Sequence, residues 1–343
     1  MDRLGFFKQG LSSLMDAASS VVGLKKAADS FVEVVDEALS NIKADIGFHL
    51  PSIDSAIYDG GASVLDNIAA MGYSSVEVGA YNNGKIHYKP HAEFKDLARK
   101  AGLRVKSAHL NRLLTPSSQE DVPMQMTEAD KQWWQEAMDI HKGLGCKYIV
   151  MAQLPEQCNA ESVGQYATYF NLVGDMAIER GMKFCFHPTK AHLQHPEVSV
   201  KAATNGATEE VEGGMGESAN ADVNATKAEN NGSTVAKSLF EMLAEATDKN
   251  KVWFELDTLE ALEANIDACE LIKQHDGRVL LLHLHDYSVT GDSGAIDFDE
   301  IIKQGTQRGV AEVFVEVRNF NLPPMNCVER SYYYVEGLPS IRH

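Results

Sequence analysis

The sequence predicts one (β/α)8 barrel, because short apolar runs alternate with longer amphipathic segments from residue 46 onward. Three of the strand candidates, "KYIVMA", "RVLLLHLH" and "EVFVEV", are almost continuously apolar, which is typical of parallel strands buried on both faces. Many helical segments end in glycine just before the next strand, as helices commonly do. The alternative fold, a doubly wound open sheet, usually has a glycine-rich phosphate-binding loop after its first strand. The segment "FHLPSIDS" at that position is not such a loop.

The repeating pattern assigns each element in order. We expect strands at Ile46–Leu50, Ser75–Gly79, Leu103–His109, Lys147–Ala152, Met182–His187, Lys251–Asp257, Val279–His285 and Glu312–Val317. We expect helices over residues 61–72, 90–101, 127–144, 161–180, 234–248, 260–275, 298–308 and 325–337. Thr127 with Asp130 and Asp297 with Glu300 are spaced as helix N-caps.

Two segments fall outside this pattern. Residues 1–44 predict an amphipathic helical extension, and residues 45–343 predict the barrel. The start "MDRLGFFK" faintly resembles a twin-arginine leader, but Asp2 stands where the first arginine would be, so we expect a cytoplasmic protein, with export as the alternative. Residues 195–233 nearly lack large apolar side chains and predict an inserted low-complexity loop after the fifth strand, either a solvated excursion or a lid.

The composition excludes several classes of protein. With 343 residues and a formal net charge of -18, the chain would repel phosphate backbones, so nucleic acid is a poor partner. No apolar run approaches the roughly 20 residues needed to span a bilayer. The cysteines are odd in number and form no CxxC pair, which argues against a disulfide framework or a cysteine zinc site.

Polar residues recur at the C-terminal ends of the expected strands, where barrel enzymes carry their active sites. Alone, each such histidine or carboxylate is most simply a hydrogen-bonded core residue. As a set, they favour a divalent cation at the barrel mouth, because buried charges are costly unless paired or coordinated. The residues are Glu77, His109, His187, Glu255, Asp257, His283, His285, Asp286 and Glu316.

The ordered segments "FELDT", "GRVLLLHLHDYS", "SGAIDFDEIIKQGTQRGV" and "VFVEVRN" resemble strands six to eight of the xylose-isomerase-like sugar isomerase/epimerase superfamily. "GMKFCFHPTKAHL" resembles its fifth strand and "MGYSSVEVGAY" its second. The resemblance implies one divalent metal, Mn²⁺, Co²⁺, Zn²⁺ or Mg²⁺, held by His187, Asp257, His283 and Glu316. Many epimerases of that family have glutamate at the position of His187, which argues against a symmetric proton transfer between two glutamates.

The resemblance also implies a reaction, in which the metal polarises a sugar carbonyl and a base removes the neighbouring proton. Glu316 or His109 is the expected catalytic base. Glu77, Glu255 and His285 are expected to bind the substrate, a small carbohydrate. The sequence leaves a homo-oligomer open.

Three other functions compete with this one. A lyase or hydrolase acting on 3-keto-glycosides would use the same metal and base. A nuclease of the same fold would want histidines where Glu260 and Asp299 stand, and the acidic surface disfavours it. A sugar-binding barrel without catalysis is the third alternative.

Overall fold

A computed structural model describes residues 45–114, 125–154, 159, 162–195 and 236–342. The expected N-terminal helical extension lies outside these residues, as does the inserted loop apart from His195. Among the residues that the structure describes, no helix is long and apolar enough to cross a membrane.

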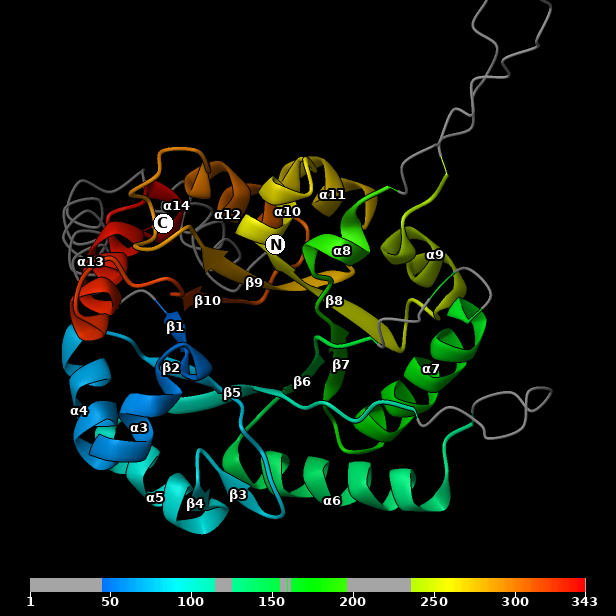
Figure 1. Ribbon diagram of the computed structural model, residues 1–343, viewed down its shortest axis with the longest axis horizontal. Helices are drawn as coiled ribbons and strands as arrows, with labels where there is room; N and C mark the ends of the chain where they lie inside the picture. The colour runs from blue at the N-terminus through cyan, green and yellow to red at the C-terminus, as the bar shows by residue number, and fades with distance from the viewer. Residues whose placement is uncertain (1–44, 115–124, 155–158, 160–161, 196–235, 343) are drawn as a thin grey trace, which may run out of the picture.

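Eight parallel strands within the described residues close into a barrel, which confirms the expected fold class. The order around the barrel is β1-β10-β9-β8-β7-β6-β5-β2. In Figure 1 the strands surround the centre and the helices lie outside them. The strands are β1 (Ile46–His49), β2 (Ser75–Val78), β5 (Arg104–His109), β6 (Tyr148–Met151), β7 (Lys183–Phe186), β8 (Val252–Asp257), β9 (Val279–His285) and β10 (Glu312–Glu316).

The helices follow the expected ranges with some additions. They are η1 (Leu50–Ile53), α3 (Asp54–Gly60), α4 (Ala62–Met71), α5 (His91–Ala101), α6 (Glu128–Leu144), α7 (Val163–Glu179), α8 (Lys190–Leu193), α9 (Leu239–Ala246), α10 (Thr258–Glu263), α11 (Ala268–Gln274), α12 (Phe298–Gln307), α13 (Pro324–Glu336) and α14 (Pro339–Arg342). A short hairpin of β3 (Lys85–Ile86) and β4 (Lys89–Pro90) follows β2 and was not expected.

The prediction of a single helix over residues 260–275 was wrong, because the chain forms two helices there, α10 and α11. Asn265 has a positive φ of 59°, which ends the first helix. The Asp267 side chain then accepts hydrogen bonds from the backbone N–H groups of Cys269 and Glu270, at 2.8 and 3.1 Å, and so caps the second. The expected caps at Thr127 and Asp297 are confirmed, since each side chain accepts from the backbone N–H three residues on.

The inside of the barrel is layered from apolar to polar. Its inner apolar cluster contains Tyr148, Val150, Cys185, Leu280, Leu281 and Phe314, with Trp253 packed against it. Gly47 on β1 makes room for the Phe314 ring, because a Cβ at that position would lie 2.3 Å from a ring carbon. Further along the same strands the inward side chains are carboxylates and imidazoles, and they form the site described below.

We expect Gly72→Ala to lower the free energy of unfolding by about 2–4 kcal/mol. Gly72 follows α4 with φ 118°, and a Cβ there would lie 2.3 Å from the Tyr332 ring. Gly102 is the matched control, because it also follows a helix with a positive φ, 80°, yet a Cβ would meet no described atom within 4 Å. Gly102→Ala is therefore expected to cost only about 1–2 kcal/mol of backbone strain. Equal losses for the two variants in urea denaturation would contradict the packing argument.

Candidate metal centre

The four residues expected to hold a metal lie together at the C-terminal ends of adjacent strands. His187 follows β7, Asp257 ends β8, His283 lies near the end of β9, and Glu316 ends β10. All four are buried, and one ligand atom from each lies within 4.8 Å of the others. Parallel pairing of successive strands brings them side by side, in the order β7-β8-β9-β10.

Asp257 is positioned by the helix that follows it. Its Oδ1 accepts hydrogen bonds from the backbone N–H groups of Leu259 and Glu260, at 2.8 and 2.9 Å, and so caps the N-terminus of α10. Its Oδ2 accepts from His285 Nδ1 at 2.8 Å and lies 4.0 Å from His187 Nε2. The cap fixes the carboxylate so that Oδ2 faces the other candidate ligands.

His187 is a buried imidazole with unused nitrogens. Neither Nδ1 nor Nε2 has a hydrogen-bond partner within the described part of the chain. Burial, followed by the charge of His283, lowers the pKa of His187 to about 3, so its ring is neutral near pH 7. A neutral, buried and unpartnered imidazole has the properties of a metal ligand.

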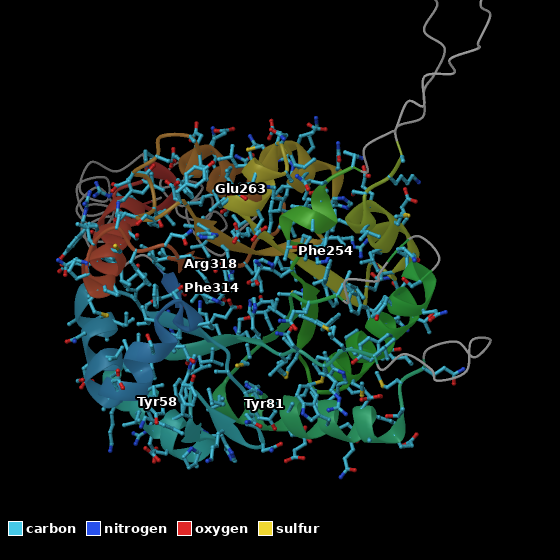
Figure 2. The ribbon with its side chains drawn as sticks, viewed as in Figure 1. Tyr58, Tyr81, Phe254, Glu263, Phe314 and Arg318 are labelled. Carbon is cyan, nitrogen blue, oxygen red and sulfur yellow. The ribbon has the colours of Figure 1, made fainter. Side chains whose placement is uncertain are left out.

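His283 and Glu316 form a close charged pair. His283 Nδ1 donates to Glu316 Oε2 at 2.5 Å. Burial opposes ionisation of both groups, but the surrounding carboxylates raise the pKa of His283 well above its usual range. The charges of His49 and His283 hold the pKa of Glu316 well below its usual range. The other Glu316 oxygen contacts the Arg318 guanidinium, and Figure 2 shows Arg318 inside the ring of helices.

Beside the four candidate ligands lie three further polar residues, His109, Glu77 and Glu255. The carboxylates of Glu77 and Glu255 are fully buried. His109 Nε2 donates to Glu255 Oε2 at 2.8 Å and lies 3.1 Å from Glu77 Oε2. Burial lowers the pKa of His109, but the two carboxylates outweigh it and raise the pKa to about 10. His109 therefore carries a proton at neutral pH.

The residues missed by sequence reasoning include His49, which ends β1 and donates from Nδ1 to Glu77 Oε2 at 2.7 Å. The rule applied to the other strands would have found it, since His49 is a polar residue at a strand end. Arg318 and Glu260 were missed as site residues for a different reason. They follow their strands by two or three residues, and only the folded chain brings the Arg318 guanidinium to 3.7 Å from a Glu260 oxygen.

We call His187, Asp257, His283 and Glu316 the mouth residues, since they lie at the C-terminal mouth of the barrel. Their donor atoms fit a divalent metal. The four residues offer two imidazoles and two carboxylates, a mixture that suits Mn²⁺, Co²⁺ and Zn²⁺. The unpartnered nitrogens of His187 support this fit, because buried polar atoms seldom lack a partner.

Comparison with known proteins supports the fold. The family described as "Xylose isomerase-like TIM barrel" matches residues 65–205. This match spans less than half of the chain, and the closed barrel of eight parallel strands agrees with the TIM barrel that the family description names. No curated protein sequence matches it.

Solved structures resemble this TIM barrel over most of its length. A sugar phosphate isomerase/epimerase from Parabacteroides distasonis is 23% identical with a TM-score of 0.68, and the match covers 88% of this chain and 96% of that one. A D-allulose 3-epimerase from Methylomonas sp., in complex with D-allulose, is 14% identical with a TM-score of 0.56, covering 85% and 96%. A probable 3-DHS dehydratase from Bacillus anthracis is 8% identical with a TM-score of 0.53, covering 85% and 98%. At these identities the likeness establishes the fold.

Proposed function

We propose that this barrel is a metal-dependent sugar isomerase or epimerase that transfers a proton next to a metal-polarised carbonyl. The observation that carries the proposal is the buried convergence of His187, Asp257, His283 and Glu316, with both nitrogens of His187 unpartnered among the described residues. Fold relatives that are named as sugar isomerases or epimerases, one of them holding D-allulose, support a carbohydrate substrate.

The chain's own residues supply the proton chemistry. A bound divalent metal would polarise the sugar carbonyl and acidify the neighbouring C–H bond. Glu316 is ionised at neutral pH, so we assign it as the base that accepts this proton. His109 is protonated at neutral pH and is assigned as the proton donor. These roles differ because positively charged groups surround Glu316, whereas two carboxylates flank His109.

Substrate contacts are divided among the remaining residues. His285 fits a hydroxyl contact, because its Nδ1 donates to Asp257 while its buried Nε2 has no partner in the described ranges. Glu77 and Glu255 were also expected to bind hydroxyls. Their complete burial against histidines favours a role within the imidazole cluster instead.

A second candidate function is a lyase or hydrolase acting on 3-keto-glycosides, and His187 favours it. An epimerase that works through two carboxylates needs a second carboxylate, besides Glu316, at the position of His187. His187 is neutral instead and has no proton to give near pH 7. Elimination next to a ketone needs only one base to remove the proton, and Glu316 can be that base.

The first experiment is elemental analysis of the purified protein, followed by thermal melts with chelator and with Mn²⁺ added back. We expect bound metal, and a melting temperature that falls on chelation and recovers with Mn²⁺, since a ligand that binds only the folded state stabilises it. The loaded protein is then assayed on D-allulose, related ketoses and a 3-keto-glycoside, with product analysis separating epimerisation from elimination. Absence of bound metal and of any melting shift would contradict the metal centre, and metal without turnover would favour a sugar-binding barrel.

A further inference from the structure

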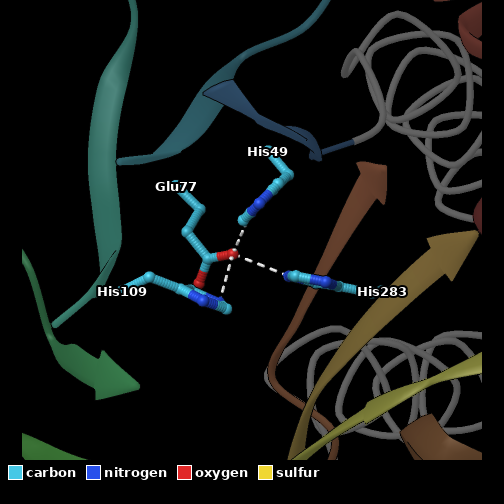
Figure 3. A group of neighbouring side chains, drawn as sticks. All are labelled: His49, Glu77, His109 and His283. Carbon is cyan, nitrogen blue, oxygen red and sulfur yellow. Dashed lines mark hydrogen bonds and ion pairs between the residues drawn. The ribbon is translucent and has the colours of Figure 1, made fainter. Parts of the chain in front are cut away.

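A second group of ligand atoms lies beside the mouth residues. His49, Glu77, His109 and His283 come from β1, β2, β5 and β9, and one ligand atom from each lies within 4.8 Å of the others. Figure 3 shows three imidazole rings around the carboxylate of Glu77. The strands that supply His49, Glu77 and His109 supply no residue of the mouth group.

The contacts to Glu77 are crowded on one oxygen. Glu77 Oε2 lies 2.6 Å from His283 Nε2, 2.7 Å from His49 Nδ1 and 3.1 Å from His109 Nε2. The hydrogen bonds from His283 and His49 already match the two lone-pair sites of this oxygen. His109 Nε2 approaches it as a third imidazole nitrogen, in an ion pair, while hydrogen bonding to Glu255. The other oxygen, Oε1, is buried and accepts no hydrogen bond from any described residue. Hydrogen bonding alone would be expected to spread the donors over both oxygens.

His283 belongs to both groups through different nitrogens. Its Nδ1 faces Glu316 at 2.5 Å, and its Nε2 faces Glu77 at 2.6 Å. The Nε2 also lies 3.3 Å from Glu255 Oε1. One ring can therefore present a ligand atom to each of two neighbouring positions, provided that both ring protons are released and the ring binds as an imidazolate.

We propose that His49, Glu77, His109 and His283 form a second divalent-cation site inside the barrel, separated from the mouth site by the His283 ring. Three imidazoles and one carboxylate select a first-row transition metal such as Mn²⁺, Co²⁺ or Zn²⁺ over Mg²⁺ or Ca²⁺, which prefer oxygen ligands. Complete or near-complete burial of His49, Glu77 and His283 would keep water from completing the coordination of a hard cation. Metal binding at this site does not depend on which sugar reaction the barrel catalyses. A cation at His109 Nε2 would replace the proton there, so His109 can act as a proton donor only while this second site is empty.

The alternative role for Glu77 is to hold His283 by a hydrogen bond, as a carboxylate commonly does for a metal-bound histidine. That role needs only the His283 contact. It does not account for the approach of His49 and His109 to the same oxygen. The two possibilities differ in the number of metal ions that the chain binds.

The test is metal stoichiometry of the full chain after loading with Mn²⁺ and desalting, for four proteins. The wild type is expected to hold about two ions per chain, and His49→Ala about one. Asp257→Asn, which removes a mouth ligand while keeping an amide oxygen to cap α10, is expected to hold about one, and the double variant none. His91→Ala, an exposed histidine outside both groups, is the matched control and should match the wild type.

Electron paramagnetic resonance of the same samples gives a second reading. Two Mn²⁺ ions joined by the imidazolate of His283 should give a broadened, coupled spectrum, and His49→Ala should restore the six-line signal of an isolated ion. Glu77→Gln, which keeps the side-chain volume, repeats the test if His49→Ala fails to fold. One ion per chain in the wild type, unchanged by His49→Ala and Glu77→Gln, would overturn the second site, and so would two ions in all variants. If the ion were lost only in Asp257→Asn, the chain would have the mouth site and no second site.

Discussion

Glu316→Gln is expected to reduce turnover at least about 1,000-fold, because it removes the proposed base and a negatively charged metal ligand together. The substitution keeps the shape of the side chain and an oxygen that can accept from His283. Metal affinity measured by titration should fall at least about 100-fold, more than the loss typical of a residue behind the ligands. Metal affinity can be measured without knowing the substrate.

Glu312→Gln provides the control for this variant. Glu312 lies on the same strand, β10, but at its opposite end, where its side chain contacts Lys106. The same chemical change there should leave metal affinity and turnover close to those of the wild type. If both variants lost metal equally, the effect would come from disturbing β10, and Glu316 would not be a ligand.

The metal-free protein is expected to become less stable as the pH rises from about 7 to about 10, owing to His109. The pKa of His109 is raised from 6.5 to about 10 by Glu77 and Glu255 against the effect of burial. Its stabilisation is therefore complete below the unfolded pKa and is lost as the pH passes through the folded value. Each pKa unit corresponds to about 1.4 kcal/mol, so the loss should amount to a few kcal/mol across this window.

Thermal or urea denaturation of chelated protein across this pH range measures the effect. His109→Gln keeps a donor for Glu255 but does not titrate, so its stability should depend less on pH there. His187 has the opposite sign, because its pKa is lowered to about 3, and its contribution is lost as the pH falls below about 6.5. A wild-type stability that is flat between pH 7 and 10 would contradict the charged state assigned to His109.

The local sequence pattern determined most of the fold. The barrel strands lie within a residue of the expected ranges, because continuous apolar runs can be buried on both faces only in a closed or covered parallel sheet. The break between α10 and α11 was not recognised, although Asp267 is a good capping residue. The β3–β4 hairpin was also missed, since its paired segments have only two residues each.

For the candidate site as well, the sequence determined one part and the tertiary structure decided another. The sequence by itself determined that histidines and carboxylates end the strands, and that His187, Asp257, His283 and Glu316 belong to strands that follow one another. Only the tertiary structure decided that the two nitrogens of His283 face different carboxylates, and that β1 brings His49 to the same oxygen as His109. The physical reason is closure: β1 pairs with β10 and with β2, so residues more than two hundred positions apart share one buried volume, and their charges set one another's protonation.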